Sequence, residues 1–243
     1  MRFILLLLLA ISPCFAEVYM YGSLSGIRGT GLSGIVLPPA PAAPWTPKWA
    51  VVLNANRVGQ YVNSGLYVSS NWTVRCLINI RSNKLANATS GIGESSIPMY
   101  WYFGHGTTAK WTARYGTGPL QTSTATPETN QYQYVICTTT NNAMYLLTNG
   151  VVILSFTASV GPQYTRTFFI GDRSSSALPS VPCHWDIARF QFLSNSVVVQ
   201  DLIATGNGNF TNVLDGAVYA VTNGVGSSDS VDISGWSIPS MSW

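Results

Sequence analysis

The chain has 243 residues, of which 47% are hydrophobic and only 9% are charged, and its formal net charge is +3 at pH 7. This length and apolar content suffice for a sizeable core in one large domain. Because charged residues are sparse and form no run, electrostatic binding of nucleic acid or of an acidic polymer is not expected.

Residues 1–16 have the pattern of a secretory signal peptide. Arg2 precedes a short apolar run, a proline ends that run, and Ala16 offers a small residue for cleavage. The run is too short to cross a bilayer as a helix, and no later run reaches about eighteen residues, so no transmembrane segment is expected. We therefore expect a secreted protein, extracellular or at the cell surface. A lipoprotein would be acylated at Cys14, an alternative that Pro13 disfavours.

Residues 17–47 differ in composition from the rest of the chain. The tetrapeptide Leu-Ser-Gly-Ile begins at Leu24 and again at Leu32 in a glycine-rich stretch, and five prolines follow between Pro38 and Pro47. Glycine disfavours a helix, and the proline-rich part prefers extended polyproline II geometry. This composition predicts an arm and a semi-rigid spacer before a domain at 48–243, with self-association through the arm as one role.

From residue 48 onward, short β-rich runs alternate with clusters of Gly, Asn, Ser and Pro, and helical periodicity is lacking. The predicted strands are 49–54, 65–69, 72–80, 98–104, 110–116, 132–140, 143–149, 151–157, 166–172, 188–193, 197–204 and 216–222. Such a series predicts an all-β sandwich or barrel.

Two local patterns support this assignment. Within 72–80, Cys76 and Ile78 alternate with Arg75 and Asn79, as in a sheet with one buried face. Asn149-Gly150 separates two of the predicted strands and is a strong signal for a tight hairpin turn.

Four ordered segments, 142–157, 166–176, 186–205 and 212–224, together resemble concanavalin A-like, laminin-G-like jelly rolls. The first segment contains a strand, an Asn-Gly turn and a second strand, and the second contains a strand that ends in Ile-Gly. The third is the closing hairpin, and the fourth is a tail that contains an Asp and an aromatic residue. The match covers roughly 63–226 and implies an antiparallel two-sheet jelly-roll sandwich for 48–243. It departs from the family in the closing hairpin, where the turn is Ser-Asn-Ser and the acid Asp201 follows Gln200 rather than a basic residue.

Asp201 raises the question of catalysis, since the resemblance includes β-glucanases. Hydrolysis by the common routes requires two carboxylates, which those glucanases carry as Glu-x-Asp-x-x-Glu on one strand. That motif is absent, and Glu17, Glu94 and Glu128 each have no other acid within five positions. We therefore expect a non-catalytic protein, with a divergent glycoside hydrolase as an alternative. Asp201 is predicted to accept backbone hydrogen bonds or to pair with Arg189 across the hairpin.

The two histidines give little support for catalysis, and Asp172 gives little support for calcium binding. No Gly-x-Ser-x-Gly motif accompanies the histidines, so His105 is expected to be a solvated loop residue and His184 to be structural. Calcium binding usually requires several carboxylates, and Asp172, the one candidate ligand, stands alone. No cofactor is expected.

Three cysteines, Cys76, Cys137 and Cys183, follow the predicted signal peptide. Export makes one disulfide among them plausible, whereas buried free thiols are an equal alternative. The sequence does not choose between the two.

Aromatic residues between 100 and 115 are the candidate ligand site. Sugars stack on exposed aromatic rings, and the set Tyr100, Tyr102, Trp111 and Tyr115, with Arg114, could line a groove. Trp101 and Phe103 alternate with the tyrosines and are expected in the core. These residues predict recognition of carbohydrate or of a cell-surface partner; a structural subunit of an extracellular assembly is the alternative.

Overall fold

The computed structural model describes residues 45–54, 60–67, 71–81, 90–96, 99–105, 108–140, 142–157, 167–171, 173–175, 178–179 and 184–240. All of them belong to the compact unit 44–243. The expected signal peptide, most of the expected arm, and Cys14, Asp172 and Cys183 lie outside the described residues. Within the described part of the chain, no helix is long and apolar enough to cross a membrane.

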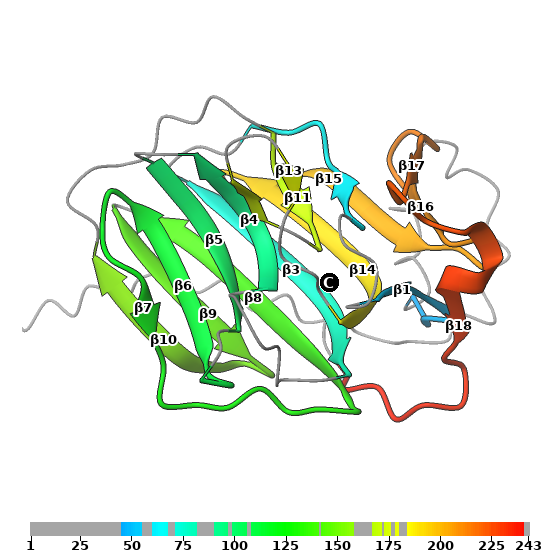
Figure 1. Ribbon diagram of the computed structural model, residues 1–243, viewed down its shortest axis with the longest axis horizontal. Coiled ribbons are helices and arrows are strands. Elements are labelled where there is room, and N and C mark those ends of the chain that lie inside the picture. The colour runs from blue at the N-terminus through cyan, green and yellow to red at the C-terminus, as the bar shows by residue number, and fades with distance from the viewer. Residues whose placement is uncertain are drawn as a thin grey trace, which may run out of the picture. The chain divides into compact units, whose positions relative to one another are not determined.

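The described strands form two sheets (Figure 1). The larger sheet contains β1 (Trp49–Leu53), β3 (Trp72–Ile80), β8 (Tyr132–Thr140), β9 (Ala143–Thr148), β10 (Val151–Thr157), β14 (Trp185–Ser194), β15 (Val197–Ala204), β16 (Asn209–Asn212), β17 (Val218–Ala220) and β18 (Ser230–Asp232). The smaller sheet contains β2 (Val62–Asn63), β4 (Ser90–Ser96), β5 (Met99–His105), β6 (Trp111–Gly116), β7 (Gln121–Thr122), β11 (Phe169–Ile170), β12 (Arg173–Ser175) and β13 (Leu178–Pro179). A short 3₁₀ helix, η1 (Gly226–Asp229), precedes β18.

Strands distant in the sequence are neighbours in the larger sheet, whose order is β10-β9-β8-β3-β14-β15-β16-β17. Strand β3 pairs antiparallel with β8 and with β14, and β1 pairs with the first part of β14 and with β18. The smaller sheet has the order β13-β12-β4-β5-β6-β7 and contains one parallel pair, β12 with β4. This arrangement confirms the expected all-β sandwich of two sheets.

The main core lies between the two sheets, which face each other in Figure 1. The face of β3 that carries Cys76 and Ile78 is fully buried there, together with Trp101 and Phe103 from β5. The alternation predicted for 72–80 is therefore confirmed on this face, and so is the core position of Trp101 and Phe103.

The opposite face of β3 is also covered, which strand alternation alone did not predict. Leu77 is buried in a second cluster with Tyr132, Tyr134 and Ile233. Ile233 belongs to the segment after β18, and its backbone N–H donates to the carbonyl of Lys48 at 2.8 Å. The C-terminal segment is thus held on the outer face of the larger sheet, where it forms part of the candidate site.

Cys76 and Cys137 lie on the neighbouring strands β3 and β8 and are free, fully buried thiols. Burial raises the pKa of both, because the thiolate would lose its hydration. The structure therefore matches the free-thiol alternative for these two residues, while Cys183 remains outside the described part.

Strand β4 was missed, and the described part of the predicted strand 65–69, residues 65–67, is not a strand. The composition of 90–96, Ser-Gly-Ile-Gly-Glu-Ser-Ser, resembles a loop. Its glycines are required by close packing, since a Cβ at Gly93 would lie 2.2 Å from the carbonyl oxygen of Trp101 on β5. Residues 64–67 are irregular, and the described strand that precedes them is β2, which pairs with β11.

The closing hairpin turns at Asn195-Ser196, between the paired residues Ser194 and Val197. Both turn residues have positive φ, 48° and 66°, as a two-residue type I′ turn requires. Asparagine adopts this conformation readily, whereas serine pays a steric cost that glycine avoids.

We expect Ser196→Gly to raise the free energy of unfolding by about 0.5–1 kcal/mol, because it removes most of this strain. Chemical denaturation of the purified protein measures the change. The matched control is Ser194→Gly, within the strand, which should lower the free energy of unfolding by about 0.5–1 kcal/mol. A loss of stability in Ser196→Gly would contradict the turn assignment.

Candidate functional site

The aromatic groove expected around β6 is not formed by Trp111 and Tyr115. Their side chains are 1% and 0% exposed, because alternation along β6 directs them between the two sheets. Trp111 packs edge-on against Trp185, with ring centres 6.4 Å apart. The expectation that these two rings line an open groove is therefore wrong, and both are core residues.

The other members of that set do not form a groove either. Tyr102 is buried and lies opposite Arg114 in the β5–β6 ladder. Arg114 is half-buried, and its Nε donates to the carbonyl oxygen of Gly118 at 2.7 Å. Tyr100 has its backbone in β5, while its side chain lies outside the described part of the structure.

Asp201 makes the predicted ion pair with Arg189. Arg189 Nε and Nη2 donate to the two carboxylate oxygens at 2.7 and 2.5 Å, and Gln191 Nε2 donates to one of them at 3.2 Å. Arg189 also lies 4.9 Å from the ring centre of Trp45, a residue that the sequence places in the spacer. Both oxygens of the buried Asp201 are therefore engaged by side chains of the closing hairpin.

His105 is not a solvated loop residue, contrary to expectation. It ends β5 with a fully buried side chain, and its ring lies 5.8 Å from that of Trp185 at an interplanar angle of 30°. Burial lowers its pKa to about 4, because the imidazolium would lose its hydration. His184 is half-buried; its carbonyl accepts from the N–H of Arg81, and its pKa is lowered by burial and by the charge of Arg81.

Asp186 is a second buried acid with structural partners. Its oxygens accept from Arg81 Nε at 2.6 Å and from Asn79 Nδ2 at 3.0 Å. Burial raises its pKa despite these two donors. Among the described residues, no group of three or more His, Cys, Asp or Glu side chains could hold a metal ion.

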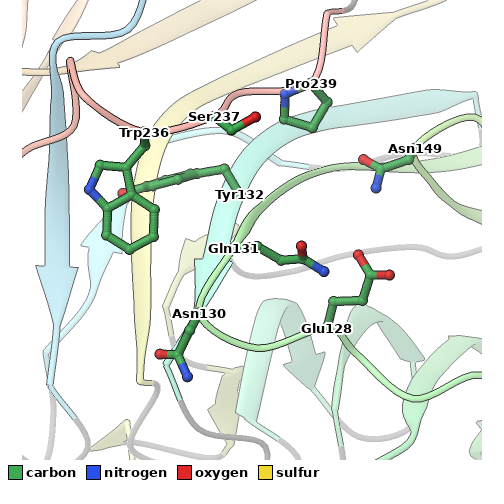
Figure 2. A pocket seen from close by; sticks show the side chains of 8 residues that line it. All are labelled: Glu128, Asn130, Gln131, Tyr132, Asn149, Trp236, Ser237 and Pro239. Carbon is green, nitrogen blue, oxygen red and sulfur yellow. The ribbon is translucent and has the colours of Figure 1, made fainter.

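A pocket of about 290 Å³ lies elsewhere, where three separate chain segments meet (Figure 2). The segments are the loop before β8, the turn between β9 and β10, and the C-terminal segment after β18. The residues that line the pocket are Glu128, Asn130, Gln131, Tyr132, Asn149, Trp236, Ser237 and Pro239. In Figure 2 they surround an open space, with Trp236 on one side and Asn149 on the other.

The loop before β8 is fastened to the end of β3. Thr129 forms a bridge with Ile80, and the N–H of Asn130 donates to the Ile80 carbonyl at 3.0 Å. Gln133 Nε2 donates to the Glu128 carbonyl, also at 3.0 Å. Asn130 has a positive φ of 58°, which asparagine tolerates better than most residues. These contacts hold the Glu128 and Gln131 side chains at the pocket.

The β9–β10 hairpin holds Asn149 on the other side. Asn149 and Gly150 form the predicted turn with φ of 47° and 82°, and Thr148 pairs with Val151. The N–H and Oδ1 of Asn149 bond the carbonyl and the N–H of Tyr134 at 2.8 and 2.9 Å. Asn149 therefore supports the turn and also lines the pocket, a second role that the sequence did not reveal.

Trp236 forms the aromatic wall of the pocket. Trp236 is 40% exposed, and its ring packs edge-on against Tyr132, at 5.3 Å between ring centres and an interplanar angle of 88°. The backbone N–H of Trp236 donates to the carbonyl of Ile233, whose side chain is buried in the outer cluster. The anchored Ile233 thus fixes the position of an exposed indole ring.

The polar side chains around this ring can bind a ligand rich in hydroxyl groups. Within the described part of the chain, the side chains of Glu128, Asn130 and Gln131 have no hydrogen-bond partner. Asn149 uses its Oδ1 on the backbone, which leaves its Nδ2 as a donor. Glu128 is the one carboxylate among the residues that line the pocket.

Sequence reasoning missed this site because its residues lie in three segments at 128–132, 149 and 236–239. A weak signal existed in Trp236, a large aromatic residue inside the polar tail Asp-Ile-Ser-Gly-Trp-Ser. The sequence around such a ring does not specify whether it is exposed, because that depends on how the C-terminal segment packs.

No protein-family model and no curated protein matches this chain. Among solved structures, the chain is similar to a candidate carbohydrate-binding protein from Bacteroides ovatus, with 16% identity and a TM-score of 0.55 over 74% of this chain and 59% of that one. It thus spans less than two thirds of that protein. It is also similar to a heptameric SAP-like pentraxin from Limulus polyphemus, with 10% identity and a TM-score of 0.50 over 78% of this chain and 96% of the pentraxin. At these identities, the similarity shows a shared β-sandwich fold.

Proposed function

We propose that this chain is a secreted, non-catalytic module that binds carbohydrate, and that the pocket beside Trp236 holds the sugar. The observation that carries this proposal is an exposed indole ring set among amide side chains and one carboxylate. The apolar face of an aromatic ring matches the C–H face of a sugar, and amide and carboxylate groups bond its hydroxyls. The β-sandwich fold, shared with a candidate carbohydrate-binding protein, supports the proposal at the level of architecture, and the pattern of residues 1–16 supports secretion.

Binding is favoured over hydrolysis by the placement of the acids. Hydrolysis of glycosides by the common routes needs two carboxylates about 5–9.5 Å apart. Glu128 has no second carboxylate among the residues that line the pocket, and Asp186 and Asp201 are engaged by arginines. The geometry therefore supports recognition without cleavage.

We expect Trp236→Ala to weaken sugar binding by about tenfold or more, since it removes the aromatic wall of the pocket. A glycan array with the intact secreted chain would first identify a ligand, and isothermal titration would then compare affinities. Tyr67→Ala is the control, because Tyr67 is an exposed aromatic residue outside the pocket.

Unchanged affinity in Trp236→Ala would show that the sugar binds elsewhere. Silence of the folded wild-type protein across broad classes of glycan would remove the carbohydrate function altogether. Circular dichroism on each variant confirms that the β-sandwich is intact.

A further inference from the structure

We infer that the Trp236 pocket selects neutral sugars and rejects sugars that carry a carboxylate, with Glu128 as the discriminating residue. This inference rests on the proposed function of the pocket. It concerns the charge of the ligand, which the fold does not determine.

The charge of the pocket favours this selection. Glu128 is exposed and is the one carboxylate in the lining, which contains no lysine, arginine or histidine. Tyr132, the other ionisable group, stays neutral, because burial raises the pKa of its phenol. A ligand carboxylate would therefore meet a like charge with no cation to offset it.

The nearest cation along the anchoring strand is already engaged. Arg81 follows β3, whose last residue, Ile80, holds the loop of the pocket. Its Nε donates to Asp186 at 2.6 Å, so that recruiting Arg81 to an acidic sugar would leave this buried carboxylate without its cation. Because of this cost, Arg81 does not offset the negative charge of Glu128 in the pocket.

The hydrogen-bonding groups match a sugar hydroxyl. The carboxylate of Glu128 only accepts hydrogen bonds, whereas the free Nδ2 of Asn149 only donates. A ligand must then donate on one side and accept on the other, as hydroxyl groups do. A carboxylate can accept from Asn149 but can donate nothing to Glu128.

The volume is that of a small-ligand site. About 290 Å³ lies at the lower end of the ~300–1,000 Å³ range of small-molecule pockets, so one sugar residue is the ligand considered. Recognition would therefore depend on the charge of a single residue of a glycan, which makes monosaccharide pairs a suitable probe.

The test uses the full secreted chain and two matched pairs of methyl glycosides: glucoside with glucuronide, and galactoside with galacturonide. For at least one pair, we expect titration calorimetry at low ionic strength to show the acid binding at least fivefold more weakly, with the difference decreasing as salt is added. Glu128→Gln should reduce this difference to less than twofold. Asp215→Asn, which removes an exposed acid outside the pocket, should leave it unchanged.

The outcomes separate this inference from the proposed function. Equal binding of neutral and acidic sugars by the wild type, or a difference that persists in Glu128→Gln, would overturn the role of Glu128 while sugar binding stands. If no glycan binds to the folded protein, on the array or by titration, the proposed function fails and the inference fails with it.

Discussion

Replacing Arg189 with methionine is expected to lower the free energy of unfolding by about 3–5 kcal/mol, because Asp201 would remain buried without its cation. Two hydrogen bonds of 2.7 and 2.5 Å join the pair, and both side chains are almost completely buried. Gln191 alone would then stabilise the carboxylate, from 3.2 Å. Urea denaturation monitored by tryptophan fluorescence measures the loss.

The double variant Arg189→Met with Asp201→Leu is the matched control for this prediction. Removing both charges eliminates the unpaired carboxylate, so most of the lost stability should return. If the single variant is as stable as the wild type, the pair has no structural importance. Sugar binding that survives in the double variant would also separate Asp201 from the functional site.

The second large effect is a loss of stability in acid caused by His105. Its pKa is lowered to about 4 in the folded protein, against 6.5 for the ordinary side chain, so the unfolded chain takes up the proton first. The contribution of neutral, buried His105 to the free energy of unfolding is fully present above pH 6.5. It declines as the pH falls, and the loss is complete below about pH 4. The total loss in free energy of unfolding is about 3.5 kcal/mol, from a pKa difference of about 2.5 at about 1.4 kcal/mol per unit.

The variant His105→Phe isolates this contribution, because phenylalanine cannot be protonated and keeps an aromatic ring beside Trp185. The measurement is the free energy of unfolding of wild type and variant at pH values from 3.5 to 7.5. His184 and Asp186 titrate in both proteins, so their effects cancel in the difference. Parallel curves for the two proteins would contradict the assignment of the acid sensitivity to His105.

The features predicted correctly from the sequence are those that depend on neighbours along the chain. Strand 72–80 was predicted with its observed limits, since alternation of Cys76 and Ile78 with polar residues is a local pattern. The turn at Asn149-Gly150 follows from the left-handed conformation that these residue types accept. The pairing of Arg189 with Asp201 could also be anticipated, because one hairpin contains both residues.

The errors arose where an environment is made by distant segments. An aromatic residue on a strand can face solvent or a second sheet, and the packing of the two sheets placed Trp111 and Tyr115 inside. His105 was expected in a loop because glycines flank it, whereas the β5–β6 ladder extends far enough to bury it against Trp185. Strand β4 was missed because its glycines are selected by the close approach of β5 rather than by strand propensity.

The all-β class, the hairpins and the scarcity of charge could be read from the sequence, because they depend on residue type and short-range periodicity. Which aromatic ring is available to a ligand depends instead on tertiary packing. The ring is Trp236, since Ile233 anchors the C-terminal segment on the outer face of the larger sheet. Tertiary packing also brings Glu128 and Asn149 to the Trp236 ring. These residues belong to segments that are distant in the sequence, and chain order alone does not specify that such segments will meet.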